Sequence, residues 1–147
     1  MNDLSLPKDF PNSVAEPFTI TSPITRNYNC IAWAFGDDSK WYWPDDYGIG
    51  FWPIPLKREC SSESFVDLFK SIGFVPCKTD KYETNFEKIA LFLDVHGFPT
   101  HAAKQIDEHK WSSKLGEHHD VSHTIKSIED GLYGKAIIFM KRKKMVK

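Results

Sequence analysis

Hydrophobic residues along the chain occur in short runs, and their spacing predicts a mixture of helices and strands. An apolar run over 30–36 predicts a short helix that Gly36 ends. Hydrophobic residues at helical spacing over 65–72 predict a second helix, which Ser61 or Ser62 caps. Shorter apolar runs bounded by turn residues are typical of strands. They lie at 88–93, 98–106, 110–115 and 135–140, with a short extended piece at 74–77.

A further helical pattern follows the third predicted strand. Val121, Ile125 and Ile128 recur at helical spacing, and Asp120 or Ser122 can cap the helix that they predict. The order of elements then predicts an α+β fold. In this fold the first helix precedes an antiparallel sheet of about four strands, with no internal repeat.

Proline content separates the first 25 residues from the rest of the chain. Residues 1–25 contain four prolines and little periodicity, which predicts an irregular arm wrapped on the domain. The remaining length is sufficient for one hydrophobic core, so 26–141 are predicted to form a single domain. A run of Lys and Arg predicts a solvated basic tail over 142–147.

Charge and cysteine content exclude several classes of protein. The chain has 19 basic and 20 acidic residues, whereas a general binder of nucleic acid or of an anionic membrane shows a basic excess. No apolar run approaches the ~20 residues of a membrane span. The first residues lack the apolar core of a secretory signal, so we expect a cytoplasmic protein, or an effector exported by another route. Three cysteines fit neither a disulfide framework nor a cysteine-rich zinc site.

Cys30 is the first candidate for chemistry because it lies in the first turn of a predicted helix. The helix dipole and unpaired N–H groups stabilise a thiolate at that position. The backbone N–H of Cys30 and the side chain of Asn29 or Asn27 can together hold an oxyanion. The alternatives are a buried cysteine that packs as a small hydrophobic residue and asparagines that act as ordinary helix caps.

His101 is the candidate base, because a thiol hydrolase needs an imidazole that accepts the proton from sulfur. A third group must orient the ring. Ser113 or Ser112 on the adjoining predicted strand can reach across from His101, and Asp120 is a rival. The alternatives are a structural histidine, solvated serines and an aspartate that caps a helix.

Aromatic residues are concentrated in the segment 41–52, called the aromatic loop. Trp41, Trp43 and Trp52 are predicted to line a substrate groove beside the thiol. The alternative is that these rings cap the core and the first helix.

Three histidines, His118, His119 and His123, lie close together in the sequence. A spacing of four residues can hold zinc when both histidines lie on one helix face. Here the predicted helix starts after His119, so we expect these residues at the start of a helix, and we expect no metal and no cofactor.

Several motifs together resemble a little-characterised family of small bacterial domains. They are Tyr28-Asn29-Cys30-Ile31-Ala32-Trp33-Ala34, Trp41-Tyr42-Trp43-Pro44, Pro99-Thr100-His101-Ala102-Ala103, Trp111-Ser112-Ser113-Lys114-Leu115-Gly116 and His123-Thr124. In layout this family is similar to the papain-like superfamily, close to its bacterial cell-wall amidase and peptidase branch. The resemblance implies a papain-like fold with Cys30 as nucleophile, His101 as base and Ser112 or Ser113 as the orienting residue. The branch usually has His, Asn or Gln at the third place, so serine is a departure.

Two functions therefore follow from the sequence. The first is a thiol hydrolase or transferase that acts on an amide or acyl bond of a peptide or protein, as a peptidase, amidase or deamidase does. The second is a non-catalytic binding, immunity or adaptor protein that uses the aromatic loop. Both predict a peptide or protein partner, without nucleic acid or membrane, and leave the oligomeric state open.

Overall fold

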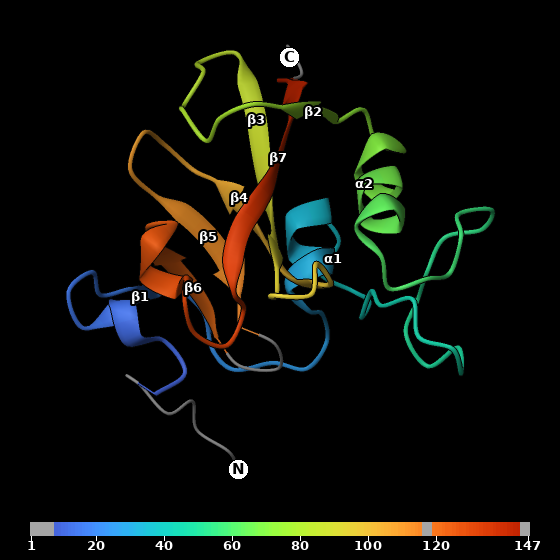
Figure 1. The fold of residues 1–147 in the computed structure, drawn as a ribbon, viewed down its shortest axis with the longest axis horizontal. Helices are drawn as coiled ribbons and strands as arrows, with labels where there is room; N and C mark the ends of the chain where they lie inside the picture. The colour runs from blue at the N-terminus through green and yellow to red at the C-terminus, as the bar shows by residue number, and fades with distance from the viewer. Residues whose placement is uncertain (1–7, 116–118, 145–147) are drawn as a thin grey trace.

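The computed structural model describes residues 8–115 and 119–144, and a seven-stranded antiparallel sheet dominates this part of the chain (Figure 1). The order across the sheet is β1-β6-β5-β4-β3-β7-β2, and every neighbouring pair is antiparallel. The short strands β1 and β2 therefore form the two edges. The strands are β1 (Thr19–Ile20), β2 (Val75–Cys77), β3 (Phe86–Leu93), β4 (Pro99–Gln105), β5 (Trp111–Lys114), β6 (Asp120–His123) and β7 (Lys135–Lys143).

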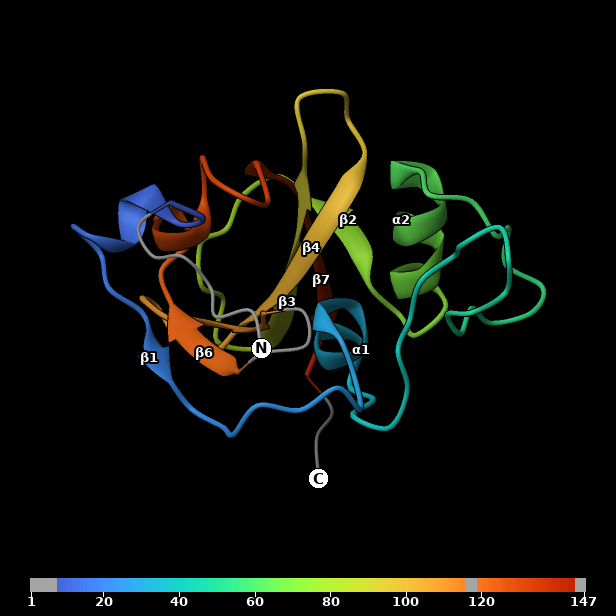
Figure 2. The ribbon, with the colours of Figure 1, turned by 90° about the horizontal axis from the view of Figure 1, so that it is seen from below.

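Helical elements cover the sheet on both sides. The α-helices α1 (Cys30–Phe35) and α2 (Ser62–Lys70) lie on one side, while the 3-10 turns Pro11–Ser13 and Lys126–Ile128 lie together on the other (Figures 1 and 2). The α1 helix packs directly against β4 and β5. We call the side that carries α1 the helix face of the sheet and the other side the arm face.

Local sequence explains where α1 begins and ends. The side chain of Asn29 accepts a hydrogen bond from the Ala32 N–H at 3.1 Å, which caps the N-terminus. Gly36 adopts a left-handed conformation with φ of 100° and donates to the Ala32 and Trp33 carbonyls, which ends the helix. Both predicted helix boundaries are confirmed, as is the start of α2 at the cap Ser61.

Alternation along the strands divides the buried residues into two hydrophobic clusters. Successive side chains of a strand point to opposite faces of the sheet. On β3, Ile89 and Leu91 pack on the helix face beneath α1, and Ala90 and Phe92 pack on the arm face. The arm-face cluster also contains Phe10, which is fully buried. The N-terminal arm therefore contributes a core residue and the edge strand β1.

The expected papain-like α+β fold, with a Cys-bearing helix on about four strands, is wrong. The structure is β-rich, with seven strands and few short helices in the described residues. The helix expected after Asp120 is instead the strand β6, which pairs with both β1 and β5. Backbone pairing on two sides outweighs a helical pattern that rested on three hydrophobic residues, because tertiary contacts override weak local preference.

The described residues contain no helix with the length and apolar character that crossing a bilayer requires.

Candidate functional site around Cys30

Cys30 is the first residue of α1, and its side chain is buried in the helix-face cluster with 5 % exposure. Burial raises the pKa of the Cys30 thiol to about 11, and hydrogen bonds from the backbone N–H groups of Ala102 and Ile31 only partly oppose this rise. Cys30 is therefore a protonated thiol near neutral pH. The helix N-terminus favours a thiolate, but desolvation has the larger effect.

A cavity of about 300 Å³ lies directly beside Cys30. It is lined by Asn29, Cys30, Trp41, Trp43, Thr100 and Tyr133. Two tryptophans of the aromatic loop and the α1 cysteine therefore meet at one cavity, which we call the Cys30 pocket. Its walls are mainly aromatic, and its polar groups come from the α1 cap and from the start of β4.

The side chain of Asn29 holds the aromatic loop on α1. Its Oδ1 accepts from the N–H groups of Ala32 and Tyr42, both at 3.1 Å, and its Nδ2 donates to the Tyr42 carbonyl at 2.7 Å. These bonds use Oδ1 and one of the two Nδ2–H donors, so the role of Asn29 in holding an oxyanion stays a prediction. Asn27 is exposed before the helix, where its backbone N–H donates to the Thr25 hydroxyl.

His101 is completely buried on β4, and its ring lies among aromatic side chains of the arm face. The ring stacks on Tyr133 at 3.9 Å between centroids and meets Phe92 edge-on at 5.3 Å. In the described part of the chain neither ring nitrogen has a hydrogen-bond partner. Burial, with a smaller effect of His123, holds the pKa of His101 well below its usual value, so the ring is neutral.

Cys30 and His101 are not hydrogen-bonded to each other, and strand alternation explains why. Ala102 packs with Cys30 in the helix-face cluster, so its neighbour His101 points to the arm face. Tyr133 is the residue that touches both regions, because it stacks on His101 and also lines the Cys30 pocket. The catalytic pairing of Cys30 with His101 stays a prediction.

The two candidate serines point to opposite faces of β5. Ser112 accepts a hydrogen bond from Trp33 Nε1 at 3.0 Å on the helix face. Ser113 is hydrogen-bonded to His123 Nε2 at 2.6 Å on the arm face. His123 Nδ1 lies 2.7 Å from the Thr124 carbonyl, which only accepts, so Nδ1 carries the proton and Nε2 accepts from the Ser113 hydroxyl. Ser113 therefore holds His123 rather than His101.

Asp120 lies on the helix face and joins β6 to the segment before α1. Its Oδ2 accepts from the Tyr28 hydroxyl at 2.7 Å. Burial and this hydrogen bond together raise the pKa of Tyr28 to about 12. Asp120 is therefore neither a helix cap nor hydrogen-bonded to His101, and its Oδ1 is buried without a hydrogen-bond partner in the described residues.

The remaining histidines form no metal site in the described residues. His119 is 2.8 Å from the Ser22 carbonyl through Nδ1, and burial lowers the pKa of His123 to about 4. The prediction for His118 lies outside the described residues. Among the residues that the structure describes, no group of three His, Cys, Asp or Glu side chains is placed to hold a metal ion.

The tryptophans of the aromatic loop differ in position. Trp41 and Trp43 line the Cys30 pocket, but Trp52 is only 5 % exposed and packs on Phe65. Its Nε1 donates to the Lys57 carbonyl at 3.0 Å. Trp52 therefore anchors the loop to the core, as the alternative interpretation of the aromatic residues expects.

A network around Asp45 braces the chain from 41 to 58, which we call the braced segment. The Asp45 carboxylate accepts from the N–H groups of Ile49 and Gly50 at 2.9 and 2.6 Å. Arg58 donates to the Asp45 carboxylate at 3.0 Å, and also to the Asp45 and Gly50 carbonyls. An aspartate ahead of glycines is a known sign of such a turn, but the distant Arg58 had no local signal.

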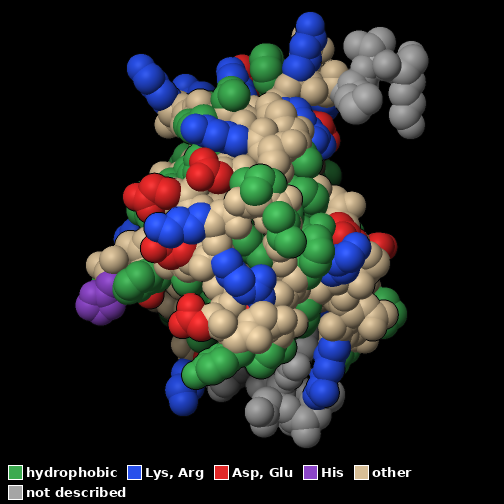
Figure 3. Space-filling model, turned by 90° about the vertical axis from the view of Figure 1, so that its right-hand side faces the viewer, with side chains coloured by type: hydrophobic (Ala, Val, Ile, Leu, Met, Phe, Trp, Pro, Cys, Tyr) green, Lys and Arg blue, Asp and Glu red, His purple; other side chains and the backbone are tan. Residues whose placement is uncertain are grey.

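The braced segment displays hydrophobic side chains to solvent. Tyr47, Ile49 and Ile54 are 89 %, 87 % and 95 % exposed. Figure 3 faces the side of the molecule that carries this segment and α2, and hydrophobic side chains lie between charged ones across the middle of that face. An apolar surface held on a fixed backbone is typical of an interaction site.

Two residues of the Cys30 pocket were missed by the sequence analysis, Thr100 and Tyr133. Thr100 Oγ1 is hydrogen-bonded to the Phe92 and Tyr133 carbonyls, so it fixes the chain before β7 against β4. Tyr133 lies about a hundred residues after Cys30 in the sequence, and only the folded sheet brings them together. No local pattern identifies that contact.

Comparison with known proteins gives a family without an assigned activity. No curated protein and no solved structure matches the chain. Residues 19–141 match the family described as a domain of unknown function, DUF7689. This match covers β1 to β6 and β7 as far as residue 141, together with the Cys30 pocket and the braced segment. The chain therefore belongs to the DUF7689 family.

Proposed function

We propose that this protein is a non-catalytic binding module that recognises a peptide or protein segment with the braced segment and the Cys30 pocket. One observation carries the proposal: Tyr47, Ile49 and Ile54 are almost completely exposed on a backbone that Asp45 and Arg58 hold in place. Large apolar side chains on a fixed backbone lose little conformational freedom when a partner binds.

The Cys30 pocket supplies a place for an anchoring side chain of the partner. Trp41, Trp43 and Tyr133 give it aromatic walls, and the protonated Cys30 thiol adds a small uncharged surface. Binding energy in protein interfaces is concentrated in such anchors, which fill pockets lined by aromatic residues. We therefore expect a partner with one large apolar side chain that enters the pocket, flanked by residues that pack on Ile49 and Ile54.

A selection of random peptides displayed on phage tests this proposal with the full chain as bait. Selected peptides are expected to share a large apolar residue. Their affinity is expected to fall at least about tenfold for a variant that combines Tyr47→Ser, Ile49→Ser and Ile54→Ser, as interface hot spots predict. Val14→Ser is the matched control, because Val14 is 71 % exposed and lies outside the braced segment.

The proposal is contradicted if no peptide is enriched, or if the triple variant binds selected peptides as well as the Val14→Ser control does. Thermal unfolding of each variant checks that the fold is retained. A Trp41→Ala variant separates the pocket from the rest of the surface, because Trp41 lines the pocket and Ile49 does not.

A thiol hydrolase that uses Cys30 is the second candidate, and the Cys30 pocket favours it. The backbone N–H groups of Ala102 and Ile31 donate hydrogen bonds to the Cys30 sulfur, next to a cavity that can hold a substrate. This function requires Cys30 to react as a thiolate near neutral pH. The rate of alkylation by iodoacetamide, followed by mass spectrometry from pH 6 to 10 with Cys77 as internal reference, distinguishes the two functions.

The binding module predicts that Cys30 reacts at least about 100-fold more slowly than Cys77 at pH 8, because a thiol with a pKa of about 11 is about one part in a thousand thiolate there. A reaction profile for Cys30 with its midpoint below pH 8 would support the hydrolase instead.

A further inference from the structure

The loop that precedes β7, residues 129–134, connects the arm face of the sheet with the Cys30 pocket, and we call it the Tyr133 loop. Tyr133 packs in the arm-face cluster and also lines the pocket. Its carbonyl accepts a hydrogen bond from Thr100 Oγ1, which joins the loop to the start of β4. Gly134 lies directly against the backbone of Leu93, where a Cβ atom would collide with it. The sheet therefore holds one side of the loop.

The N-terminal arm holds the other side of the Tyr133 loop. The Asp9 carbonyl accepts a hydrogen bond from the Leu132 N–H at 2.9 Å. Asn12 Nδ2 donates to the Glu129 carbonyl at 3.2 Å. A Cβ atom on Gly131 would collide with the Asp9 carbonyl, so the backbones of the arm and the loop are in direct contact. The arm therefore contacts both the start and the middle of the loop.

The ring of Tyr133 packs against two aromatic side chains, one from the sheet and one from the arm. His101 stacks on it at 3.9 Å between centroids, and the fully buried Phe10 lies 5.6 Å from it with the ring planes tilted by 52°. Burial raises the pKa of Tyr133, and Cys30 and Asp9 add to this rise. The hydroxyl of Tyr133 is therefore within electrostatic reach of both the pocket and the arm.

The arm joins the sheet through a short strand. β1 has two residues, which pair with Val121 and Ser122 of β6. Segments with few backbone hydrogen bonds open at a lower free energy than the whole fold. When the arm opens, Tyr133 loses the Phe10 ring and its loop loses the bonds to the arm, while the strands of the sheet stay paired.

We infer that the N-terminal arm, chiefly through Phe10, positions Tyr133 as a wall of the Cys30 pocket and so regulates binding there. The path is short, because Phe10 contacts Tyr133 and Tyr133 lines the pocket. As a regulation of binding, this inference rests on the proposed function. Phe10 is a positioning residue, because it acts on the pocket through Tyr133.

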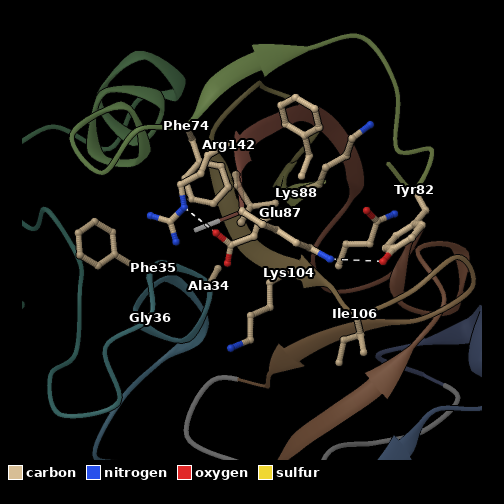
Figure 4. Close-up of a pocket in the computed structure, with 14 residues that line it drawn as sticks. Ala34, Phe35, Gly36, Phe74, Tyr82, Glu87, Lys88, Lys104, Ile106 and Arg142 are labelled. Atoms are coloured by element: carbon tan, nitrogen blue, oxygen red, sulfur yellow. Dashed lines mark hydrogen bonds and ion pairs between the residues drawn. The ribbon is translucent and has the colours of Figure 1, made fainter. Parts of the chain in front are cut away.

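A second cavity, of about 220 Å³, lies at the C-terminal end of α1 and provides an internal reference (Figure 4). Gly36 lines it, and the ion pair between Arg142 and Glu87, at 2.8 Å, lies among its other lining residues. None of the described residues that line it belongs to the arm or to the Tyr133 loop. Signals from this cavity are therefore expected to stay constant when the arm is changed.

Two-dimensional NMR of the full chain without any peptide tests the positioning. Phe10→Leu and Asn12→Ala are each expected to shift the backbone amide signal of Cys30 and the indole N–H signal of Trp41, because the ring of Tyr133 moves relative to both. The amide signal of Gly36 is expected to stay in place. Thermal unfolding checks that each variant is folded, and Asn12→Ala carries the test if Phe10→Leu does not fold.

Phe139→Leu is the matched control. Phe139 is a partly buried aromatic residue of the same arm-face cluster, and its ring packs on Trp111. This variant is expected to leave the signals of Cys30 and Trp41 unchanged. The inference is overturned if both arm variants leave these two signals at their wild-type positions, or if Phe139→Leu shifts them as much.

Peptide affinity tests the regulation. Peptides selected on the full chain are expected to bind Phe10→Leu and Asn12→Ala about three- to tenfold more weakly than the wild type, and Phe139→Leu unchanged. Because coupling is reciprocal, a saturating peptide is expected to slow hydrogen exchange of the Leu132 N–H by the factor that arm opening costs in affinity. Equal affinity of the arm variants and the wild type would overturn the inference. If no peptide is enriched, the proposed function fails, while the NMR comparison still decides whether the arm positions Tyr133.

Discussion

The two faces of the sheet bury polar side chains in different ways. On the helix face, Asn29, Ser112 and Asp120 all have hydrogen-bond partners in α1, in the segment before it or in the loop after it. On the arm face, His123 is bonded to Ser113, but both nitrogens of His101 lack a partner within the described residues. The polar groups of the helix face hold elements together, although Asp120 Oδ1 has no partner within the described residues, whereas the neutral imidazole of His101 on the arm face packs against aromatic rings.

The difference follows from the alternation of one strand. On β4, Ala102 leaves room for α1 to approach the sheet, and this close approach puts Cys30 on the helix face. The same alternation turns His101 to the arm face. Because Ala102 packs against α1, its neighbour His101 must point to the other side of the sheet.

The largest expected effect tests whether the two faces unfold together. Phe65→Ala removes a ring from the helix-face cluster and Phe92→Ala removes one from the arm-face cluster, and both residues are fully buried. Each substitution is expected to lower the free energy of unfolding by about 3–5 kcal/mol. Urea denaturation monitored by circular dichroism measures the change. Two separate transitions in either variant would show that the faces are independent units.

Acid is expected to destabilise the arm face specifically. Burial lowers the pKa of His123 to about 4 and also lowers the pKa of His101. Below the ordinary histidine pKa of about 6.5, the unfolded chain therefore binds more protons than the folded chain. The stability that these two neutral histidines contribute is therefore fully present above pH 6.5 and is lost as the pH falls toward 4. His123 alone accounts for about 3 kcal/mol of this loss at pH 4.

Urea denaturation at several pH values between 4 and 7.5 measures this dependence. His123→Gln keeps a group that can bond to Ser113 but does not titrate, so its stability is expected to change less with pH than that of the wild type. His109→Gln, in an exposed turn, is the control and should retain the full dependence. Equal stability of the wild type at pH 7.5 and pH 4.5 would contradict the prediction.

Hydrogen bonds at the start of α1, on the helix face, are expected to contribute more to the free energy of unfolding than those that follow β6, on the arm face. Asn29→Ala removes three buried hydrogen bonds at the start of α1 and is expected to cost about 3 kcal/mol. On the arm face, Thr124→Ala removes two part-buried hydrogen bonds, one from the Ser127 N–H and one to the Glu16 carboxylate, and is expected to cost about 1 kcal/mol. Thermal unfolding of both variants compares them, and equal losses would remove the distinction between the two faces.

The smallest expected effect compares adjacent serines of β5. Ser113→Ala leaves the buried Nε2 of His123 without a donor and is expected to cost about 1–2 kcal/mol. Ser112→Ala leaves Trp33 Nε1 without its acceptor at a partly exposed position, where water replaces it, so about 0.5 kcal/mol is expected. Chemical denaturation of the two variants measures which one loses more stability. A larger loss for Ser112→Ala than for Ser113→Ala would contradict the assignment of the two serines to the faces.

Elements with strong local patterns were predicted correctly from the sequence. Both α-helices and the strands β3, β4, β5 and β7 lie where apolar runs and capping residues predict them. The strands β1 and β6 were not predicted. β1 has two residues and exists because it pairs with Val121 and Ser122, so its only signal is another segment of the folded chain.

The candidate site was predicted in part. Cys30, Trp41 and Trp43 were expected at one groove, and the structure places all three around one cavity. The direction of His101 was not recognised, although Ala102 gave an indication: a helix that packs on this small residue leaves the adjacent histidine on the opposite face. The contribution of Tyr133 was beyond any local pattern, because the contact depends on how β7 follows β3 in the sheet.

The edge strands of the sheet have a consequence for the protein at high concentration. β1 has two residues, and β2 has three, of which Pro76 offers no N–H group. An edge this short, with a proline in it, gives a second chain few free backbone groups to pair with. The two edge strands therefore limit edge-to-edge aggregation only where they lie: β2 pairs with residues 139–141 of the nine-residue β7, so its protection does not extend along that whole strand.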